Sequence, residues 1–379
     1  KYRLKAPDGT PLDRDLADSW ARVALALSEA EPPDQRTARA AEFAHALAGH
    51  RFLPAGRILA GVGTGRNVTL FNCFVMGTID DSMDGIFSAL REAALTLQQG
   101  GGIGYDFSTL RPKGAAVAGV GADASGPTSF MDVWDAMCRT IMSAGSRRGA
   151  MMAVMRCDHP DIIDFIEAKQ TAGRLRMFNL SVLVSDDFMR AVKEDARWDL
   201  KFNGTVLKSL PARELWDRIM KATYAYAEPG VIFIDRINAL NPLNYCETIS
   251  ATNPCGEQPL PPYGACLLGS INLAKLVRNA FDDDAHLDRD ELERLVASAV
   301  RIANEHRVPV TVQGGRSGVV GGAIPQTGGI ALDITALNSI VDIDETSLTV
   351  RVQAGCFGPD LEKALNAKGF TVGHFPQSF

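Results

Sequence analysis

The fold is indicated first by an apolar run, Phe178-Asn179-Leu180-Ser181-Val182-Leu183-Val184, which reads as a strand. The segments on either side of it, 159–170 and 186–194, have the length and composition of helices, and Pro160 opens the first of them. Helix, strand and helix therefore alternate along the chain. This order favours an α/β fold with a mainly parallel sheet.

The same alternation extends in both directions from this run. Apolar stripes predict further helices over 82–98, 129–143 and 211–227, and Val231–Ile234 is a second strand-like piece. Asp81 and Ser82 both offer an N-cap for the helix that starts at 82. No internal repeat or low-complexity segment interrupts the pattern.

Composition places the chain among ordinary globular proteins. It has 379 residues, of which 46% are hydrophobic and 22% charged, and its formal net charge is −6. The negative charge argues against DNA and against anionic membranes as partners. No apolar run is long enough to span a bilayer. The expected location is the cytoplasm.

Cysteine usage supports the same compartment. Seven cysteines, an odd number, lie far apart in a long chain, a pattern that suits reduced thiols better than a disulfide framework. No pair of CxxC motifs is present, so neither structural zinc nor another metal is expected. The cysteines are at positions 73, 138, 157, 246, 255, 266 and 356.

The pattern of predicted helices and strands changes twice along the chain. Residues 1–50 read as a helical region, 51–300 as an α/β region, and 301–379 as a separate segment of short β-type runs with a helix at 359–367. A helix over 288–304 precedes the second change. No flexible linker marks the boundary near 300–307.

The densest chemical signal is Asn253-Pro254-Cys255-Gly256-Glu257. Proline and glycine prevent a regular helix there. In an extended segment, Asn253, Cys255 and Glu257 would point to one face and place a sulfur beside a carboxylate and an amide. A buried cysteine in a proline-rich loop is the plainer alternative, and an isolated motif of this kind would favour it.

Two further stretches accompany this motif: Leu70-Phe71-Asn72-Cys73-Phe74-Val75 and the glycine-rich segment 98–114. With 250–273 they resemble the ribonucleotide reductase large-subunit family, most closely its adenosylcobalamin-dependent class II. The resemblance covers about residues 1–300. It implies an N-terminal helical region and part of a ten-stranded α/β barrel, with the cysteine on an inner loop.

The resemblance also implies roles for individual residues. Cys255 matches the thiyl-radical cysteine that takes the substrate 3′-hydrogen, Glu257 the carboxylate that takes the 3′-OH proton, and Asn253 the amide that holds the ribose hydroxyls. Cys73 and Cys266 match the dithiol pair that becomes a disulfide in each turnover. That pairing requires their α-carbons to lie within about 7 Å.

Other residues match ligand contacts of the family. The resemblance assigns Asn72 and Gly114 to substrate binding, and Asp81 and Arg147 to a deoxynucleotide effector. Simpler interpretations stay open: Asp81 could be an N-cap, and Arg147 could lie in a solvated loop. The glycines at 100–104 follow a helix, so they do not form a dinucleotide fingerprint. They allow either a tight turn or a close approach of backbone to a ligand or strand.

The segment 301–379 carries a different pattern. A glycine-rich stretch, 313–322, follows the β-type run Val308–Val312 and would present backbone N–H groups to an anion. The segment resembles the N-terminal part of the FAD-binding (PCMH-type, α+β) domain of vanillyl-alcohol-oxidase-type flavin oxidases. The residues matching its pyrophosphate loop are Gly314, Gly315, Arg316, Ser317 and Gly318.

These two resemblances lead to three functional hypotheses. The first is a ribonucleotide reductase fragment that uses adenosylcobalamin, a ribonucleotide substrate, a deoxynucleotide effector and a thioredoxin-like reductant, as a homodimer. The second is an FAD-dependent oxidoreductase acting through the C-terminal segment. The third is a nucleotide-binding remnant without activity. Both families are incomplete, so we expect a joined fragment, natural or artefactual.

Overall fold

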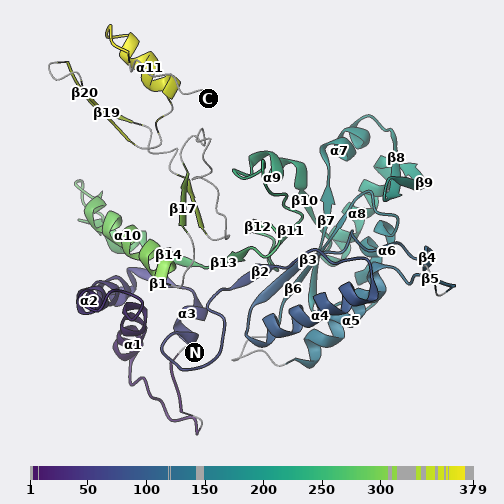
Figure 1. Cartoon of the computed structure of the whole chain (residues 1–379), viewed down its shortest axis with the longest axis horizontal. Helices are drawn as coiled ribbons and strands as arrows, with labels where there is room; N and C mark the ends of the chain where they lie inside the picture. Colours follow the sequence, from purple (N-terminus) through teal and green to yellow (C-terminus); the bar gives the residue numbers. More distant parts are fainter. Residues whose placement is uncertain are drawn as a thin grey trace. The chain divides into compact units, whose positions relative to one another are not determined.

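The computed structural model describes residues 3–6, 8–117, 119, 121–141, 149–305, 310–313, 330–333, 339–345, 349–353, 356 and 358–371. The chain divides into two compact units, Lys1–Leu295 and Val296–Phe379. The first unit holds nearly all of the regular structure (Figure 1).

The first unit begins with a pair of packed helices, α1 (Leu16–Ser28) and α2 (Arg36–Leu47). The Asp15 side chain caps α1 by accepting a hydrogen bond from the Asp18 N–H. Apolar residues of both helices are buried, among them Val23 and Phe43, each 0% exposed. The chain continues through η1 (Ala48–His50), β1 (Phe52–Pro54) and α3 (Gly56–Gly61). β1 then pairs antiparallel with β14 (Gly269–Ile271).

A six-stranded sheet forms the centre of the first unit. Its strand order is β10-β7-β6-β3-β2-β13, and the strands from β10 to β2 run parallel, while β13 joins antiparallel. Such a curled parallel sheet is half of a barrel. The strands are β2 (Cys73–Val75), β3 (Gly102–Asp106), β6 (Met151–Arg156), β7 (Phe178–Val184), β10 (Gly230–Phe233) and β13 (Ala265–Cys266).

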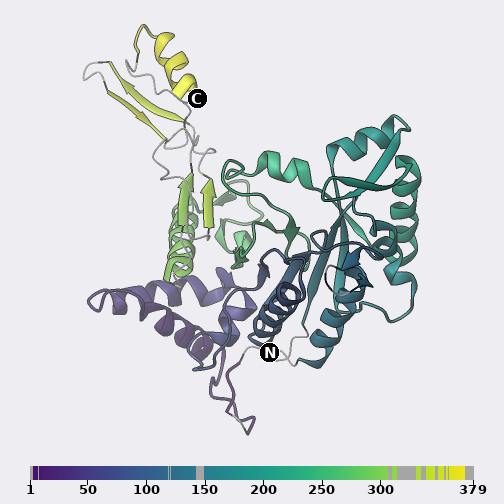
Figure 2. The same ribbon diagram turned by 45° about the vertical axis from the view of Figure 1, so that its right-hand side comes forward.

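Helices cover one face of this sheet, as parallel sheets require (Figure 1). Figure 2 shows from a second angle that α4 (Met83–Gln98) and α5 (Pro127–Thr140) lie side by side against it. Trp134 of α5 is fully buried and meets Tyr105 and Phe107 edge-on. The other covering helices are α6 (Ile162–Glu167), η2 (Ala168–Gln170), α7 (Asp186–Lys193) and α8 (Ala212–Tyr226).

The opposite face of the sheet receives the segment around β11, and Ile234 and Ile237 of α9 pack against the same cluster. Val75, Met152 and Val154 of the strands are buried there together with Ala251 of β11 (Ala251–Thr252). β11 pairs antiparallel with β12 (Pro259–Leu260), so the intervening residues form a hairpin loop on the inner side of the half-barrel. This placement determines the candidate site.

Short hairpins and connections complete the first unit. They are β4 (Ala116–Val117) with β5 (Ala122–Asp123), β8 (Arg197–Phe202) with β9 (Thr205–Pro211), α9 (Ile234–Leu240), η3 (Leu273–Leu276), and β15 (Val277–Arg278) with β16 (His286–Leu287). Within the described ranges, no helix combines the length and apolarity needed to cross a bilayer.

α10 (Arg289–Glu305) begins in the first unit and continues into the second. Its Glu291 is buried and lies 3.0 Å from the His45 ring, which fixes the start of the helix on the N-terminal region. In the second unit, β17 (Val310–Gln313) pairs parallel with β18 (Ile330–Asp333). β19 (Ile340–Asp344) pairs antiparallel with β20 (Thr349–Val352), and α11 (Gly358–Asn366) follows.

Most expected elements are present within a few residues of their predicted bounds. The strand at 178–184 has the predicted bounds, and the helix expected over 82–98 begins at Met83. One interpretation was incomplete: Gly102–Asp106, within the glycine-rich segment, is the central strand β3. Its glycines concealed a strand, because glycine has low strand propensity.

Candidate active site

The loop between β11 and β12 is a tight turn and not the extended segment that the sequence suggested. The Gly256 N–H donates to the Asn253 carbonyl at 3.0 Å, and Gly256 has a φ of +84°, a conformation that glycine adopts without strain. The loop is closed at its base where the Asn253 N–H donates to the Gln258 carbonyl at 3.1 Å. Cys255 lies at the tip and is exposed.

Asn253 and Glu257 meet across this loop. The Asn253 Nδ2 donates to Glu257 Oε1 at 2.8 Å, and the Gln258 N–H donates to Asn253 Oδ1 at 3.0 Å. Asn253 is 0% exposed, whereas Glu257 is exposed. The amide is thus directed at the carboxylate and the loop backbone, and it holds Glu257 beside the cysteine tip.

Two glycines of β3 let the loop lie directly on the sheet. A Cβ at Gly104 would overlap the Thr252 carbonyl oxygen, and one at Gly102 would lie 2.8 Å from Pro254 Cγ. Both contacts are closer than a real side chain tolerates. Of the two interpretations of this segment, the structure therefore favours close approach of a neighbouring backbone over a tight turn.

We expect Gly104→Ala to push segment 252–254 off the sheet. Overpacking of this kind costs about 1–3 kcal/mol, and the free energy of unfolding in urea should fall by that amount. Gly358→Ala is the control, because a Cβ at that position would have nothing within 4 Å and the φ of Gly358 is not positive. Equal stability of the two variants would show that the loop does not rest on β3.

Cys73 and Cys266 are direct cross-strand partners. Cys73 of β2 pairs in register with Cys266 of β13, and both are buried, at 3% and 7% exposure. The Cys73 thiol hydrogen-bonds to Cys266 and raises the pKa of that thiol, and burial acts in the same direction. Directly opposed residues of an antiparallel pair have α-carbons about 4.5–5.5 Å apart, within the reach of a disulfide.

The loop and the thiol pair occupy one region. The Cβ position of Gly102 is 3.5 Å from Cys73 Sγ and also contacts Pro254, the chain neighbour of Cys255. The Glu257 carboxylate contributes to the raised pKa of Cys266. The structure therefore brings together Asn253, Cys255, Glu257, Cys73 and Cys266 at the amino-terminal ends of β2 and β3.

Asn72, the expected substrate contact beside Cys73, has an unusual side chain. Its Oδ1 is buried and accepts no hydrogen bond within the described part of the chain. A buried polar atom without a partner costs free energy unless a ligand or water satisfies it. The Asn72 main chain is held on both sides, by the Cys266 carbonyl and the Gly102 N–H.

The other predicted ligand residues lie elsewhere. Gly114 is in the turn before β4, and its N–H donates to the Ala124 carbonyl. Figure 1 shows β4 well separated from β11 and β12. Asp81 does not cap α4, because Ser82 does so. Instead the Asp81 carboxylate binds Arg111, with the Arg111 Nε at 2.9 Å. Arg147 lies outside the described residues, and so does the stretch 314–318.

Sequence reasoning missed Asn179. Asn179 lies on β7, and its Nδ2 donates a hydrogen bond to the Pro254 carbonyl oxygen at 2.6 Å. The available signal was a polar residue near the start of an otherwise apolar strand, which is too common to stand out. Gly102 and Gly104 were noticed as glycines, but their strand was not.

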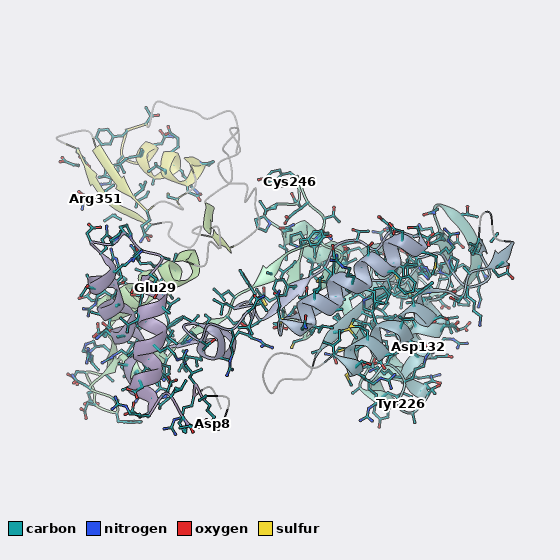
Figure 3. The ribbon with its side chains drawn as sticks, turned by 60° about the horizontal axis from the view of Figure 1, so that its bottom comes forward. Asp8, Glu29, Asp132, Tyr226, Cys246 and Arg351 are labelled. Carbon is teal, nitrogen blue, oxygen red and sulfur yellow. The ribbon has the colours of Figure 1, made fainter. Side chains whose placement is uncertain are left out.

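Three other cysteines of the first unit lie on other segments of the chain. Cys138 and Cys157 are buried, which raises their pKa values to about 11 and about 12. Cys246, labelled in Figure 3, is exposed in the segment between α9 and β11. Across the described part of the chain, no three His, Cys, Asp or Glu side chains gather as a metal site would require.

A cavity of about 320 Å³ lies beside the β11–β12 hairpin, at the carboxyl-terminal ends of β2 and β3. Asp106 faces it, and burial raises the pKa of that carboxyl to about 6. The cavity is lined by Met76, Gly77, Thr78, Asp106, Thr109, Thr248, Ser250, Ala251 and Pro262.

Fold and site together define an α/β half-barrel protein with an inner cysteine loop beside a dithiol pair. Comparison with known families specifies the class. Residues 71–306 match the ribonucleotide reductase barrel domain, and residues 1–67 match the ribonucleotide reductase all-alpha domain. The chain belongs to the ribonucleotide reductase large-subunit family. Residues 291–379 match an FAD binding domain, so the two matches overlap over residues 291–306, which include most of α10.

Individual relatives agree with this assignment. A vitamin B12-dependent ribonucleoside-diphosphate reductase from Mycobacterium tuberculosis is 41% identical over 310 residues, 80% of this chain and 44% of the relative. A protein of the same name from Thermoplasma acidophilum is 42% identical over 257 residues, 67% of this chain and 33% of the relative. The large subunit of ribonucleoside-diphosphate reductase from vaccinia virus is 26% identical over 284 residues. The chain thus spans less than half of the length of these relatives.

Proposed function

We propose that the chain carries the thiol chemistry of a vitamin B12-dependent ribonucleotide reductase, converting a ribonucleotide into a 2′-deoxyribonucleotide. One observation carries this proposal: an exposed cysteine on a loop fixed to the sheet lies beside two buried, mutually hydrogen-bonded thiols. In the proposed reaction one sulfur reacts as a radical and the other two supply electrons.

Each residue has a defined part in the proposed reaction. A thiyl radical at Cys255 takes the 3′-hydrogen of the ribose, while Glu257 accepts the 3′-OH proton. One thiol of the Cys73–Cys266 pair protonates the departing 2′-OH, which leaves as water. The pair supplies two electrons and closes to a disulfide, and Cys255 returns the hydrogen to C3′. The sum is ribonucleotide plus two thiols giving deoxyribonucleotide, disulfide and water.

The electrostatics of the pair suit this role. The raised pKa of Cys266 keeps that thiol protonated at neutral pH, so it can act as a proton donor. Asn253 positions Glu257 through the 2.8 Å hydrogen bond. Contact between Asn253 and the ribose requires the substrate to reach an amide that is buried in this structure.

The site fits an external source of the radical. Cys255 is exposed at the loop tip, so its sulfur is accessible to a cofactor bound outside the loop. Adenosylcobalamin, when bound, supplies the adenosyl radical chemistry that removes the thiol hydrogen. The protein holds the sulfur in place and keeps the two electron-donating thiols buried beside it.

Ligands and partners follow from the same proposal. The unsatisfied Asn72 Oδ1 suits a hydrogen bond from the nucleotide. Asp81, which is paired with Arg111, and Arg147 are the proposed contacts of a deoxynucleotide effector. A thioredoxin-like protein in the cytoplasm would reopen the disulfide, and the active form would be a homodimer.

A second candidate function rests on the C-terminal match. β17 ends at Gln313, immediately before the expected pyrophosphate residues at 314–318, and pairs parallel with β18. A strand followed by a glycine-rich sequence suits a dinucleotide phosphate. Flavin absorbance of the purified protein would support FAD binding, and its absence after incubation with FAD would contradict it.

The leading proposal is tested with the complete chain. We expect deoxynucleotide formation when a ribonucleotide, adenosylcobalamin and a dithiol are supplied together, and none when the cobalamin is omitted. Di- and triphosphates should both be tried, with all four deoxynucleotides as effectors. Effector binding without product under every condition would favour the inactive remnant instead.

A further inference from the structure

Asn179 is placed to control the peptide that carries Cys255. Its Nδ2 donates to the Pro254 carbonyl oxygen at 2.6 Å, and that carbonyl belongs to the amide group joining Pro254 to Cys255. A peptide group is planar, so fixing its oxygen fixes the orientation of its N–H and of the next α-carbon. The hydrogen bond from β7 thereby fixes the peptide plane that precedes Cys255.

The position of Asn179 follows from the sheet register. Asn179 of β7 pairs with Met152 of β6, and Met152 pairs with Gly104 of β3, so the three lie in one row on the face that receives the loop. Gly104 contacts Thr252, and Met152 Cε lies 3.7 Å from the Cβ position of Gly256. Each of these three adjacent strands thus contacts the segment 252–256.

Other contacts leave few degrees of freedom at the tip. The ring of Pro254 fixes its own φ and packs against Gly102, and Asn253 is held by Gln258 and Glu257. The Asn179 hydrogen bond fixes the next peptide plane. What remains is the backbone rotation at Cys255 itself and its side-chain rotamer.

We infer that Asn179 is a positioning residue for Cys255, setting the direction of its sulfur by holding the Pro254–Cys255 peptide. The expected effect on radical formation rests on the proposed function, whereas the orientation of the Pro254–Cys255 peptide by Asn179 does not. A misplacement of about 1 Å can cost about 100-fold in rate. Loss of the bond should therefore lower radical formation at Cys255 without weakening the fold to a similar extent.

The test compares Asn179→Ala and Asn179→Asp with Ser181→Ala. Aspartate keeps the size and polarity of asparagine, but its ionised carboxylate cannot donate to the carbonyl. A role in packing alone would therefore leave the aspartate variant like the wild type. Ser181 lies two residues further along the same face of β7 and is buried, so Ser181→Ala controls for the loss of a polar side chain from this face of the strand.

Two readouts separate the outcomes. With nitrogen-15-labelled cysteine, the seven cysteines give up to seven backbone amide signals, and Cys255→Ser identifies that of Cys255. Release of tritium from the 5′-position of adenosylcobalamin into water reports radical formation. We expect both Asn179 variants to move the Cys255 signal and to slow this release by about tenfold to 100-fold. The signals of Cys138 and Cys157, the thermal midpoint and the Ser181→Ala protein should change little.

An unmoved Cys255 signal in Asn179→Asp, or an unchanged rate of tritium release, would overturn the positioning role while leaving the proposed function intact. The opposite pair of results would separate the two proposals as well. If the signal moves but even the wild type releases no tritium, Asn179 still orients the cysteine peptide, and it is the reductase proposal that fails.

Discussion

Replacing Cys255 by alanine is expected to abolish deoxynucleotide formation while leaving the protein folded. Alanine has no hydrogen that a radical can exchange reversibly with a ribose C–H bond, so the rate should fall by about 10³-fold or more. Because Cys255 is exposed at a loop tip, the free energy of unfolding should change by less than about 0.5 kcal/mol. Urea denaturation and a nucleotide reduction assay measure the two quantities.

Cys246→Ala is the matched control for this prediction. Cys246 is also exposed, and it precedes β11, outside the loop. Its replacement should leave both the rate and the stability unchanged. Retention of the full rate in Cys255→Ala would exclude the sulfur at 255 from the reaction.

Replacing Cys73 or Cys266 by alanine is expected to stop turnover at a different point. Either change removes one of the two thiols that supply the electrons, so no disulfide can form. Radical formation at Cys255 does not require this pair. Tritium release should therefore persist, and deoxynucleotide formation should fall to background. Because both side chains are buried, a loss of about 1 kcal/mol in stability should accompany each change.

Mass spectrometry checks the electron source directly. A single turnover without external dithiol should join the peptides containing Cys73 and Cys266 in the wild type. Cys157→Ala is the control, since that thiol is buried elsewhere and has a raised pKa. A turnover disulfide linking any other two cysteines would contradict the assignment of the pair.

The strand at 178–184 and the helix α4 could be predicted because their apolar residues follow the spacing of those structures. The strand β3 could not, since Gly102 and Gly104 lack the side chains that produce such a pattern. Their meaning depends on Thr252 and Pro254, about 150 residues away in sequence, which pack onto them. Long-range packing of this kind leaves no local trace.

The candidate site shows the same division. The residue types at 253, 255 and 257 were informative by themselves, because an amide, a thiol and a carboxylate are chemically distinctive. Their geometry was not: the loop turns at Gly256, so Asn253 meets Glu257 across it. The hairpin β8–β9 was also missed, although Trp198, Leu200 and Phe202 alternate with charged residues along β8, which is the pattern of a half-buried strand.

Exchange of tritium from the 5′-position of adenosylcobalamin into water is the most direct test of the central claim, that Cys255 carries a thiyl radical. It requires neither complete turnover nor a reductant. We predict release with the wild type and none above background with Cys255→Ala. Equal release by the two proteins, or none by a folded wild type that binds the cobalamin, would contradict the claim.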